Sequence, residues 1–229
     1  MPEPTILSQQ LLLSVAEELK LPLVQIAREA ERNDPGLAGI RATAEAALRL
    51  LDSYSLGVRL ALEPAELGQE SITVSSVLYE AGQQLDGLAK QYDVRLELNV
   101  AGRFGPVLAH RQGLQAALVS LGAALIEALP AQGGEQLKLQ LATHRSRYGI
   151  VAGLYADTKQ LSTDALRRGR ALQSRSRQPL INLTHTSGAG IFVADAILQA
   201  MRLKLLTSRH HRLYGLGTVL QPSQQIQLV

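Results

Sequence analysis

Apolar residues near the N-terminus recur at alternating spacings of four and three. The first series is Leu12, Ala16, Leu19, Leu23, Ile26 and Ala30, and the second is Leu37, Ile40, Ala44, Ala47, Leu51, Tyr54 and Val58. This heptad spacing keeps one apolar seam along one side of a helix. The turn-forming residues Asn33-Asp34-Pro35-Gly36 lie between the two series, where the first helix must end. The pattern predicts a helical hairpin within residues 1–66.

A lone hairpin of this length would leave both apolar seams exposed to water. Pairing with a second copy buries them in a four-helix bundle, which is a common arrangement of two helical hairpins. We therefore expect residues 1–66 to be a dimerisation domain and the protein to be a homodimer.

After Glu63-Pro64 the pattern changes to short stretches in which apolar and polar residues alternate, separated by longer, mainly apolar stretches. We expect a second domain over residues 67–229, entered through a linker at 66–70, with Ser75 and Ser76 capping its first helix. The expected strands are 72–74, 94–98, 107–109, 137–141, 150–156, 203–208, 214–220 and 226–229. The expected helices are 77–90, 111–129, 163–174 and 190–201. This order predicts an α/β sandwich with a mixed sheet and helices on one face.

Composition narrows the classes of function. The chain has 229 residues, 46% of them hydrophobic and 19% charged, with a net charge of +3 and no cysteine. Disulfides and thiolate metal sites are excluded, and a cytoplasmic location is expected. The sequence contains no uninterrupted apolar run of about 18 residues, so no membrane-spanning segment is expected. The small net charge and the absence of tryptophan argue against nucleic acid as a partner.

The first heptad series contains the segment Ala16-Glu17-Glu18-Leu19-Lys20-Leu21-Pro22-Leu23, in which Pro22 predicts a kink. Its order of acid, leucine, base, variable residue, proline and leucine resembles the phospho-acceptor box of sensor histidine kinases. The resemblance implies that Glu17 stands at the reactive histidine, Glu18 at the assisting acid, and Leu21 at the Thr or Asn used for phosphatase activity. Because a carboxylate lacks the imidazole nitrogen that carries phosphate, no catalytic residue is expected here. Alternatively, Glu17 and Glu18 only solvate an ordinary bundle helix.

The element order after the hairpin resembles the ATP-binding domain of histidine kinases, the Bergerat fold. Aligned on Leu121, the metal-binding asparagine of the family falls on Ala124, which cannot coordinate Mg²⁺. Glu127, about one turn further on, is either a substitute ligand or a solvated charge. The resemblance implies that Asp157 accepts the adenine amino group, although Lys159 and Leu161 replace the glycines that usually follow it. Alternatively, Asp157 ends a strand in a turn.

The segment Ser187-Gly188-Ala189-Gly190-Ile191-Phe192 resembles the glycine-rich turn of the family, whose backbone amides bind phosphate. Gly188 and Gly190 are kept, but Phe192 replaces a glycine and is expected to crowd the phosphate. The two glycines could also serve only as an ordinary turn. Five arginines lie where the resemblance places the nucleotide lid of the family: Arg167, Arg168, Arg170, Arg175 and Arg177. They either contact phosphates or an acidic partner, or they belong to an exposed basic loop. His210 and His211 indicate a turn between strands more than a metal site.

These substitutions predict a degenerate histidine-kinase-like signalling protein that acts by dimerisation and by binding a response regulator or another histidine kinase. No metal and no cofactor are expected, and ATP would bind weakly if at all. The alternative is a weakly ATP-binding histidine kinase or phosphotransferase with residual activity. A phosphotransferase would need a histidine on the hairpin, whereas the five histidines all lie outside it, at His110, His144, His185, His210 and His211.

The heptad seams yield a test of the dimer. Replacing both Leu19 and Leu51 by Glu places charges on the two seams, and burying an unpaired charge is strongly unfavourable. We expect the doubly substituted chain to be monomeric and the parent chain dimeric in multi-angle light scattering. A parent chain that stays monomeric at high concentration would contradict the predicted bundle.

Overall fold

The structure is a computed structural model that describes residues 68–100, 102, 104–129, 137–157 and 189–223, together with the positions Ile26 and Leu56. Both isolated positions are helical, in agreement with the heptad pattern. The rest of the predicted hairpin lies outside the described residues. Glu17, Glu18, Leu21 and Pro22 therefore keep only their sequence interpretation, as does the four-helix bundle.

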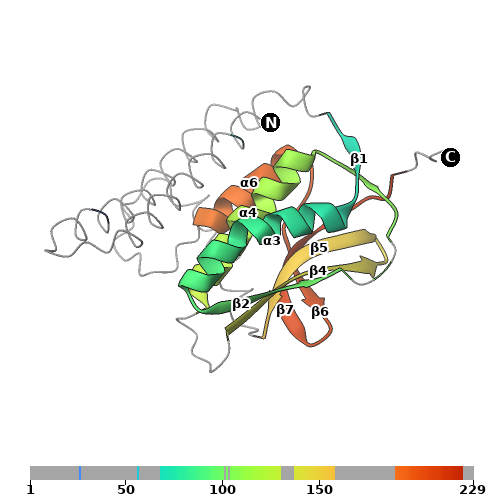
Figure 1. Ribbon diagram of the computed structural model, residues 1–229. Coiled ribbons are helices and arrows are strands. Elements are labelled where there is room, and N and C mark those ends of the chain that lie inside the picture. The colour runs from blue at the N-terminus through green and yellow to red at the C-terminus, as the bar shows by residue number, and fades with distance from the viewer. Residues whose placement is uncertain are drawn as a thin grey trace, which may run out of the picture.

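Three helices and seven strands make up the described part of residues 68–223 (Figure 1). The strands are β1 (Glu70–Ile72), β2 (Val94–Asn99), β3 (Val107–Ala109), β4 (Leu137–Ser146), β5 (Gly149–Ala156), β6 (Leu206–His210) and β7 (Leu213–Leu220). The helices are α3 (Val74–Gln91), α4 (Arg111–Ala128) and α6 (Ala189–Ala200). All three helices lie together on one side of the larger sheet (Figure 1).

The larger sheet has five strands in the order β2-β4-β5-β7-β6. β2 pairs with β4 in parallel, and every other pair in this sheet is antiparallel. β1 and β3 form a separate two-stranded antiparallel sheet. The predicted mixed sheet with helices on one face is confirmed.

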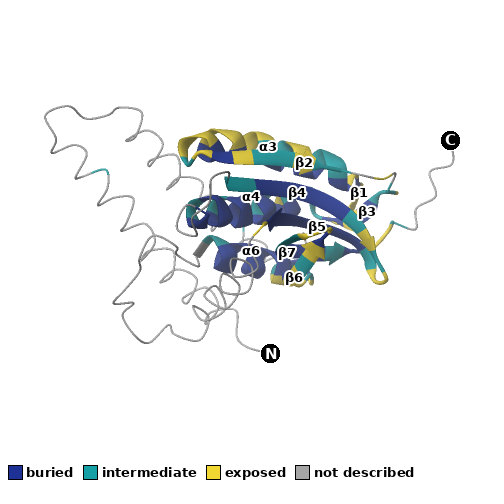
Figure 2. Ribbon diagram, turned by 90° about the horizontal axis from the view of Figure 1, so that it is seen from below, coloured by how far each residue is buried: buried dark blue, intermediate teal, exposed yellow. Residues whose placement is uncertain are grey.

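The hydrophobic core lies between the large sheet and the helices. In register across the three central strands, Leu141, Leu154 and Leu216 face this core, because side chains two residues apart share one face of a strand. Figure 2 shows α4 and α6 as mostly buried, whereas α3 keeps an exposed outer face. α4 packs against both α3 and α6. Its central place explains why its sequence is apolar on nearly every side.

Several element boundaries differ from the sequence prediction: β1 spans 70–72 instead of 72–74, and β4 continues to 146 instead of ending at 141. α3 begins at Val74 with Thr73 as its N-cap, so Ser75 and Ser76 are not the caps; the Ser76 hydroxyl donates to the Thr73 carbonyl oxygen at 2.8 Å. β6 spans 206–210 instead of 203–208, because the chain leaves α6 through a turn at 201–202 and an extended stretch at 203–205. The predicted helix 163–174 and strand 226–229 lie outside the described residues. None of the described helices is both long and apolar enough to cross a membrane.

Candidate functional site

The residues that sequence analysis assigned to metal and phosphate meet where α6 crosses α4. A methyl group added at Gly190, in the first turn of α6, would lie 2.6 Å from the Ser120 carbonyl oxygen and 2.9 Å from the Ala124 methyl carbon. Both distances are shorter than van der Waals contact. The absence of a side chain at Gly190 therefore permits this close approach of the two helices. The structure thus brings Ala124 and Gly190 together.

The groups at this contact do not suit a magnesium ion. Ala124 supplies only a methyl group and is 7% exposed. The Ser120 hydroxyl, one turn earlier, is buried and has no hydrogen-bond partner in the described part of the chain. Mg²⁺ in nucleotide sites is held by one or two carboxylates with phosphate and water oxygens, in near-octahedral geometry. No cluster of three His, Cys, Asp or Glu residues that could hold a metal occurs among the described residues.

The other predicted site residues are dispersed. Asp157 follows the end of β5 and is exposed, while Gly188 lies outside the described residues. Phe192 is 3% exposed and belongs to the hydrophobic core. Its side chain therefore packs inside the domain, which differs from the sequence prediction that Phe192 crowds a phosphate. Glu127 is half-buried, and its charge adds to burial in raising the pKa of Tyr92 at the end of α3.

A polar cluster that sequence analysis missed lies on the sheet face opposite the helices. Tyr155 is fully buried there, and its hydroxyl donates to the Ser208 hydroxyl oxygen at 3.2 Å. The rings of His144 and His210 lie 5.9 and 5.4 Å from the tyrosine ring and 5.3 Å from each other. The ring of His211, at the tip of the β6–β7 hairpin, is 4.3 Å from that of His210. The cluster thus joins β4, β5 and β6.

Glycines make room for this cluster, and they are the sequence signal that could have revealed it. A methyl group at Gly153 would lie 2.8 Å from the Tyr155 hydroxyl oxygen and 2.6 Å from the Leu216 carbonyl oxygen. Gly153 and Gly217 face each other across β5 and β7. Since glycine is disfavoured inside strands, paired glycines indicate a close approach. Here the Tyr155 hydroxyl lies close to Gly153.

Burial sets the electrostatics of the cluster. It raises the pKa of Tyr155 to about 12, although the hydrogen bond with Ser208 opposes that shift. Burial also lowers the pKa of His210, and the neighbouring His211 and His144 lower it further. The pKa of His144 is lowered by burial first and by His211 second. Both pKa shifts favour the neutral form of the two imidazoles.

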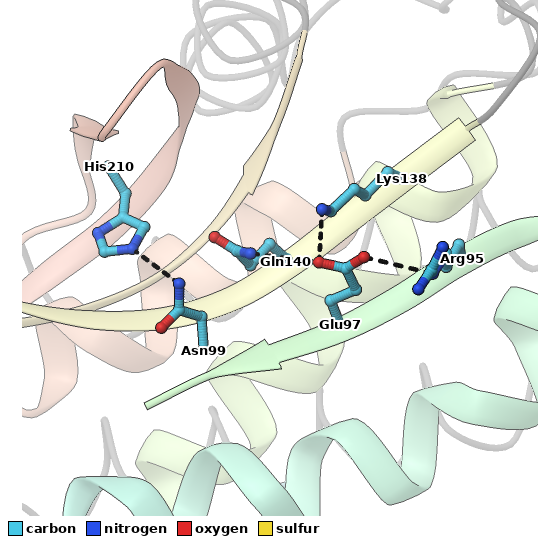
Figure 3. Close-up of polar contacts among 6 residues, drawn as sticks. All are labelled: Arg95, Glu97, Asn99, Lys138, Gln140 and His210. Atoms are coloured by element: carbon cyan, nitrogen blue, oxygen red, sulfur yellow. Dashed lines mark hydrogen bonds and ion pairs between the residues drawn. The ribbon is translucent and has the colours of Figure 1, made fainter. Parts of the chain in front are cut away.

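A second polar group continues along the same face of β2 and β4 (Figure 3). The Glu97 carboxylate contacts the Arg95 Nε atom at 3.3 Å, the Lys138 Nζ atom at 2.5 Å and the Gln140 side-chain nitrogen at 3.4 Å. The Lys138 hydrogen bond is the main cause that lowers the pKa of Glu97. Further along β2, the Asn99 amide nitrogen lies 3.4 Å from His210 Nε2, which connects this edge to the histidine cluster. We assign these contacts to the stability of the sheet edge.

Comparison with known proteins supports the fold at low sequence identity. No family model matches the sequence, and no curated protein matches it. Among solved structures, Acinetobacter baumannii histidine kinase AdeS matches with a TM-score of 0.57 and 13% identity, over 90% of this chain and 98% of that chain. Histidine kinase ThkA in complex with response regulator TrrA matches at 0.53 and 14%, over 93% and 61% of the two chains. Full-length ShkA in complex with AMPPNP matches at 0.52 and 11%, over 96% and 46%.

These similarities establish the fold of a histidine kinase core. At 11–14% identity they carry no assignment of activity to this chain. What the chain can do must therefore be argued from its own residues.

The contact between Gly190 and α4 predicts the effect of adding one methyl group. Gly190→Ala forces the added methyl group against the Ser120 carbonyl oxygen and the Ala124 methyl group, and overpacking of this kind typically destabilises by about 1–3 kcal/mol. The better helix propensity of alanine offsets roughly 1 kcal/mol of that. We expect a net loss of about 1 kcal/mol in denaturant unfolding. Gly87→Ala in α3, where nothing lies within 4 Å of the added carbon, should instead be stabilising; equal effects at both positions would contradict this account.

The histidine cluster predicts a pH-dependent stability. Because the folded-state pKa values of His144 and His210 lie below the ordinary 6.5, the unfolded chain binds more protons as pH falls through that value. Stability should be fully present above pH 6.5 and decline below it. His210→Gln keeps an acceptor for Asn99 but cannot titrate, so its melting temperature should fall less between pH 7.5 and 5.5. Identical pH profiles for the parent and the variant would refute this linkage.

Proposed function

We propose that this chain is a catalytically degenerate, histidine-kinase-like signalling protein that acts by dimerisation and by binding a partner. The observation that carries the proposal is the contact of Ala124 with Gly190. At the position where the family resemblance requires a metal-binding asparagine, a buried methyl group packs against a neighbouring helix. Magnesium-dependent phosphoryl transfer has no side-chain ligand at that position.

The acceptor side supports the same proposal. Glu17 stands where the resemblance requires histidine, and the chain has no histidine before His110. Phosphate carried on nitrogen needs an imidazole, so residues 1–66 offer no such acceptor. Two losses at separate positions, one on each side of the transfer reaction, argue for a role that does not require the transfer.

The candidate partners are a response regulator or another histidine kinase. ThkA, which shares this fold, has been crystallised with the response regulator TrrA. In the proposed function, the homodimeric four-helix bundle of residues 1–66 presents the surface to which a regulator binds. A degenerate chain could sequester the regulator or pair with an active kinase.

The alternative is a weakened ATP-binding protein with residual kinase or phosphotransferase activity. ShkA, which shares the fold, has been crystallised with AMPPNP. Asp157 is exposed at the end of β5, and Gly190 is present at the start of α6, so part of the family's pocket pattern is retained. Nucleotide binding measurements separate the two functions.

We expect no magnesium-dependent binding of ATP in isothermal titration calorimetry, because the position of the metal ligand holds Ala124. We also expect no acid-labile phosphate on the protein after incubation with radiolabelled ATP, because Glu17 cannot accept it. Circular dichroism of the same sample verifies that the chain is folded. A micromolar, magnesium-dependent dissociation constant, or labelling that is lost with His110→Gln, would return the chain to the enzyme class.

A further inference from the structure

A cavity of about 260 Å³ lies away from the Ala124–Gly190 contact, at the other end of α6. Three segments form its walls: the residue before β1, the junction of β3 with α4, and the end of α6 with the turn that follows. The lining residues are Gln69, Leu108, Ala109, His110, Ala200, Met201, Arg202 and Leu203. The set combines apolar side chains with a guanidinium, an imidazole and a carboxamide, and it contains no acidic group.

Arg202 occupies an unusual backbone conformation at the rim of this cavity. Its φ angle is +60°, in the left-handed region. The Arg202 N–H donates to the Gln199 carbonyl oxygen at 2.9 Å, and the Leu203 N–H donates to the Leu198 carbonyl oxygen at 2.8 Å. These two bonds define a Schellman turn, in which the left-handed position is usually glycine. An arginine in this conformation carries backbone strain that glycine would avoid. The turn itself therefore does not account for the presence of an arginine side chain at this position.

Arg202 also forms no ion pair with any described residue. An arginine that stabilised the fold through a neighbouring carboxylate would offset the strain of its backbone. Without such a neighbour, the guanidinium is available to an anion. Its planar donors suit a carboxylate or a phosphate.

His110 provides a second donor to the cavity. Its Nδ1 atom accepts the Gly113 backbone N–H at 3.0 Å and caps the start of α4. In the neutral ring, the proton therefore resides on Nε2, which becomes a donor. Gln69 adds a carboxamide from the segment that leads into β1.

The remaining walls are apolar. Met201 is 5% exposed, Leu203 packs against the core, and Leu108 is among the most exposed large hydrophobic residues of the described chain. Such walls favour a ligand with a hydrocarbon portion over a fully hydrated inorganic ion. The volume is near the lower end of the usual range for small-molecule sites, roughly 300–1,000 Å³, and suits a compact ligand.

We propose that this cavity binds a small organic carboxylate, whose charged group meets Arg202 and His110 and whose short hydrocarbon chain lies against Leu108, Met201 and Leu203. The site is separate from the degenerate nucleotide position and does not depend on the proposed signalling role. Because Gln69 precedes β1, a bound ligand would contact the segment through which the chain enters the domain.

The two methionines of the chain provide a direct probe. Met201 lines the cavity and Met1 is the N-terminal residue. With ¹³C-methyl methionine in the full chain, titration with sodium hexanoate should shift the Met201 methyl resonance in a saturable way and leave Met1 unchanged. Met201→Leu assigns the two resonances. Neutral 1-hexanol lacks the charged group, and inorganic phosphate lacks the hydrocarbon chain. Each should bind at least about tenfold more weakly than hexanoate, because each loses either the charge-assisted contact or the apolar contacts.

Arg202→Gly is the decisive variant, because glycine is the preferred residue of this turn. It should keep the fold and raise the melting temperature, yet weaken hexanoate binding at least about tenfold. Asp93→Gly, at another left-handed position (φ 52°) that does not line the cavity, is the matched control. It should also raise the melting temperature but leave binding unchanged.

Several results would overturn the proposal. A Met201 resonance that does not move with hexanoate in the folded parent chain excludes the site. Equal binding by the parent and Arg202→Gly excludes the guanidinium as its anchor. Equal binding of hexanoate and 1-hexanol would mean an apolar cavity without anion recognition. None of these measurements uses ATP or a partner protein, so their failure is distinguishable from failure of the proposed function.

Discussion

The close contact of α6 with α4 is the constraint on which both the fold and the functional proposal depend. Gly190 brings the start of α6 against the Ser120 carbonyl oxygen and the Ala124 methyl group. α4 is in turn packed against α3, so the helical layer is assembled around one central helix. The same small residues that permit this packing stand at the positions that the sequence resemblance assigns to the metal ligand and the phosphate-binding turn of histidine kinases.

This overlap between packing and the proposed loss of chemistry has a physical basis. A metal ligand on α4 must present an oxygen to a hydrated site, whereas a methyl group at Ala124 is favourable when the neighbouring helix covers it. Once the ligand is absent, close helix packing is the favourable use of that surface. Under the proposed function, the histidine kinase core fold persists without the chemistry, because its stability rests on the core beneath the helices.

The outer face of the sheet is stabilised in a different way. None of the described helices covers it, and its centre is instead filled by Tyr155 with His144, His210 and Ser208, where Gly153 leaves space for the tyrosine hydroxyl. Burial lowers the pKa of both histidines and so favours their neutral form. The helix side thus depends on apolar packing, and the opposite side depends partly on a polar cluster sensitive to protons.

The sequence alone determined the class of the domain and most of its elements. Period-two alternation at Leu137, Leu139 and Leu141 and at Val94, Leu96 and Leu98 identified strands, because alternate side chains of a strand share one face. The long apolar run of α4 was recognised from its composition, and Ala124 was singled out by the resemblance to the histidine kinase family. These features are local, so they can be read from neighbouring positions in the chain.

Only the tertiary structure decided how distant residues combine. The meeting of Gly190 with Ala124, the burial of Phe192 in the core, and the grouping of His144 with Tyr155 and His210 depend on strand order and helix crossing, which no local pattern encodes. The strained arginine at position 202 was equally invisible, because a left-handed turn is normally signalled by glycine. Local spacing specifies which face a residue occupies, whereas the packing of elements far apart in the chain specifies what lies against that face.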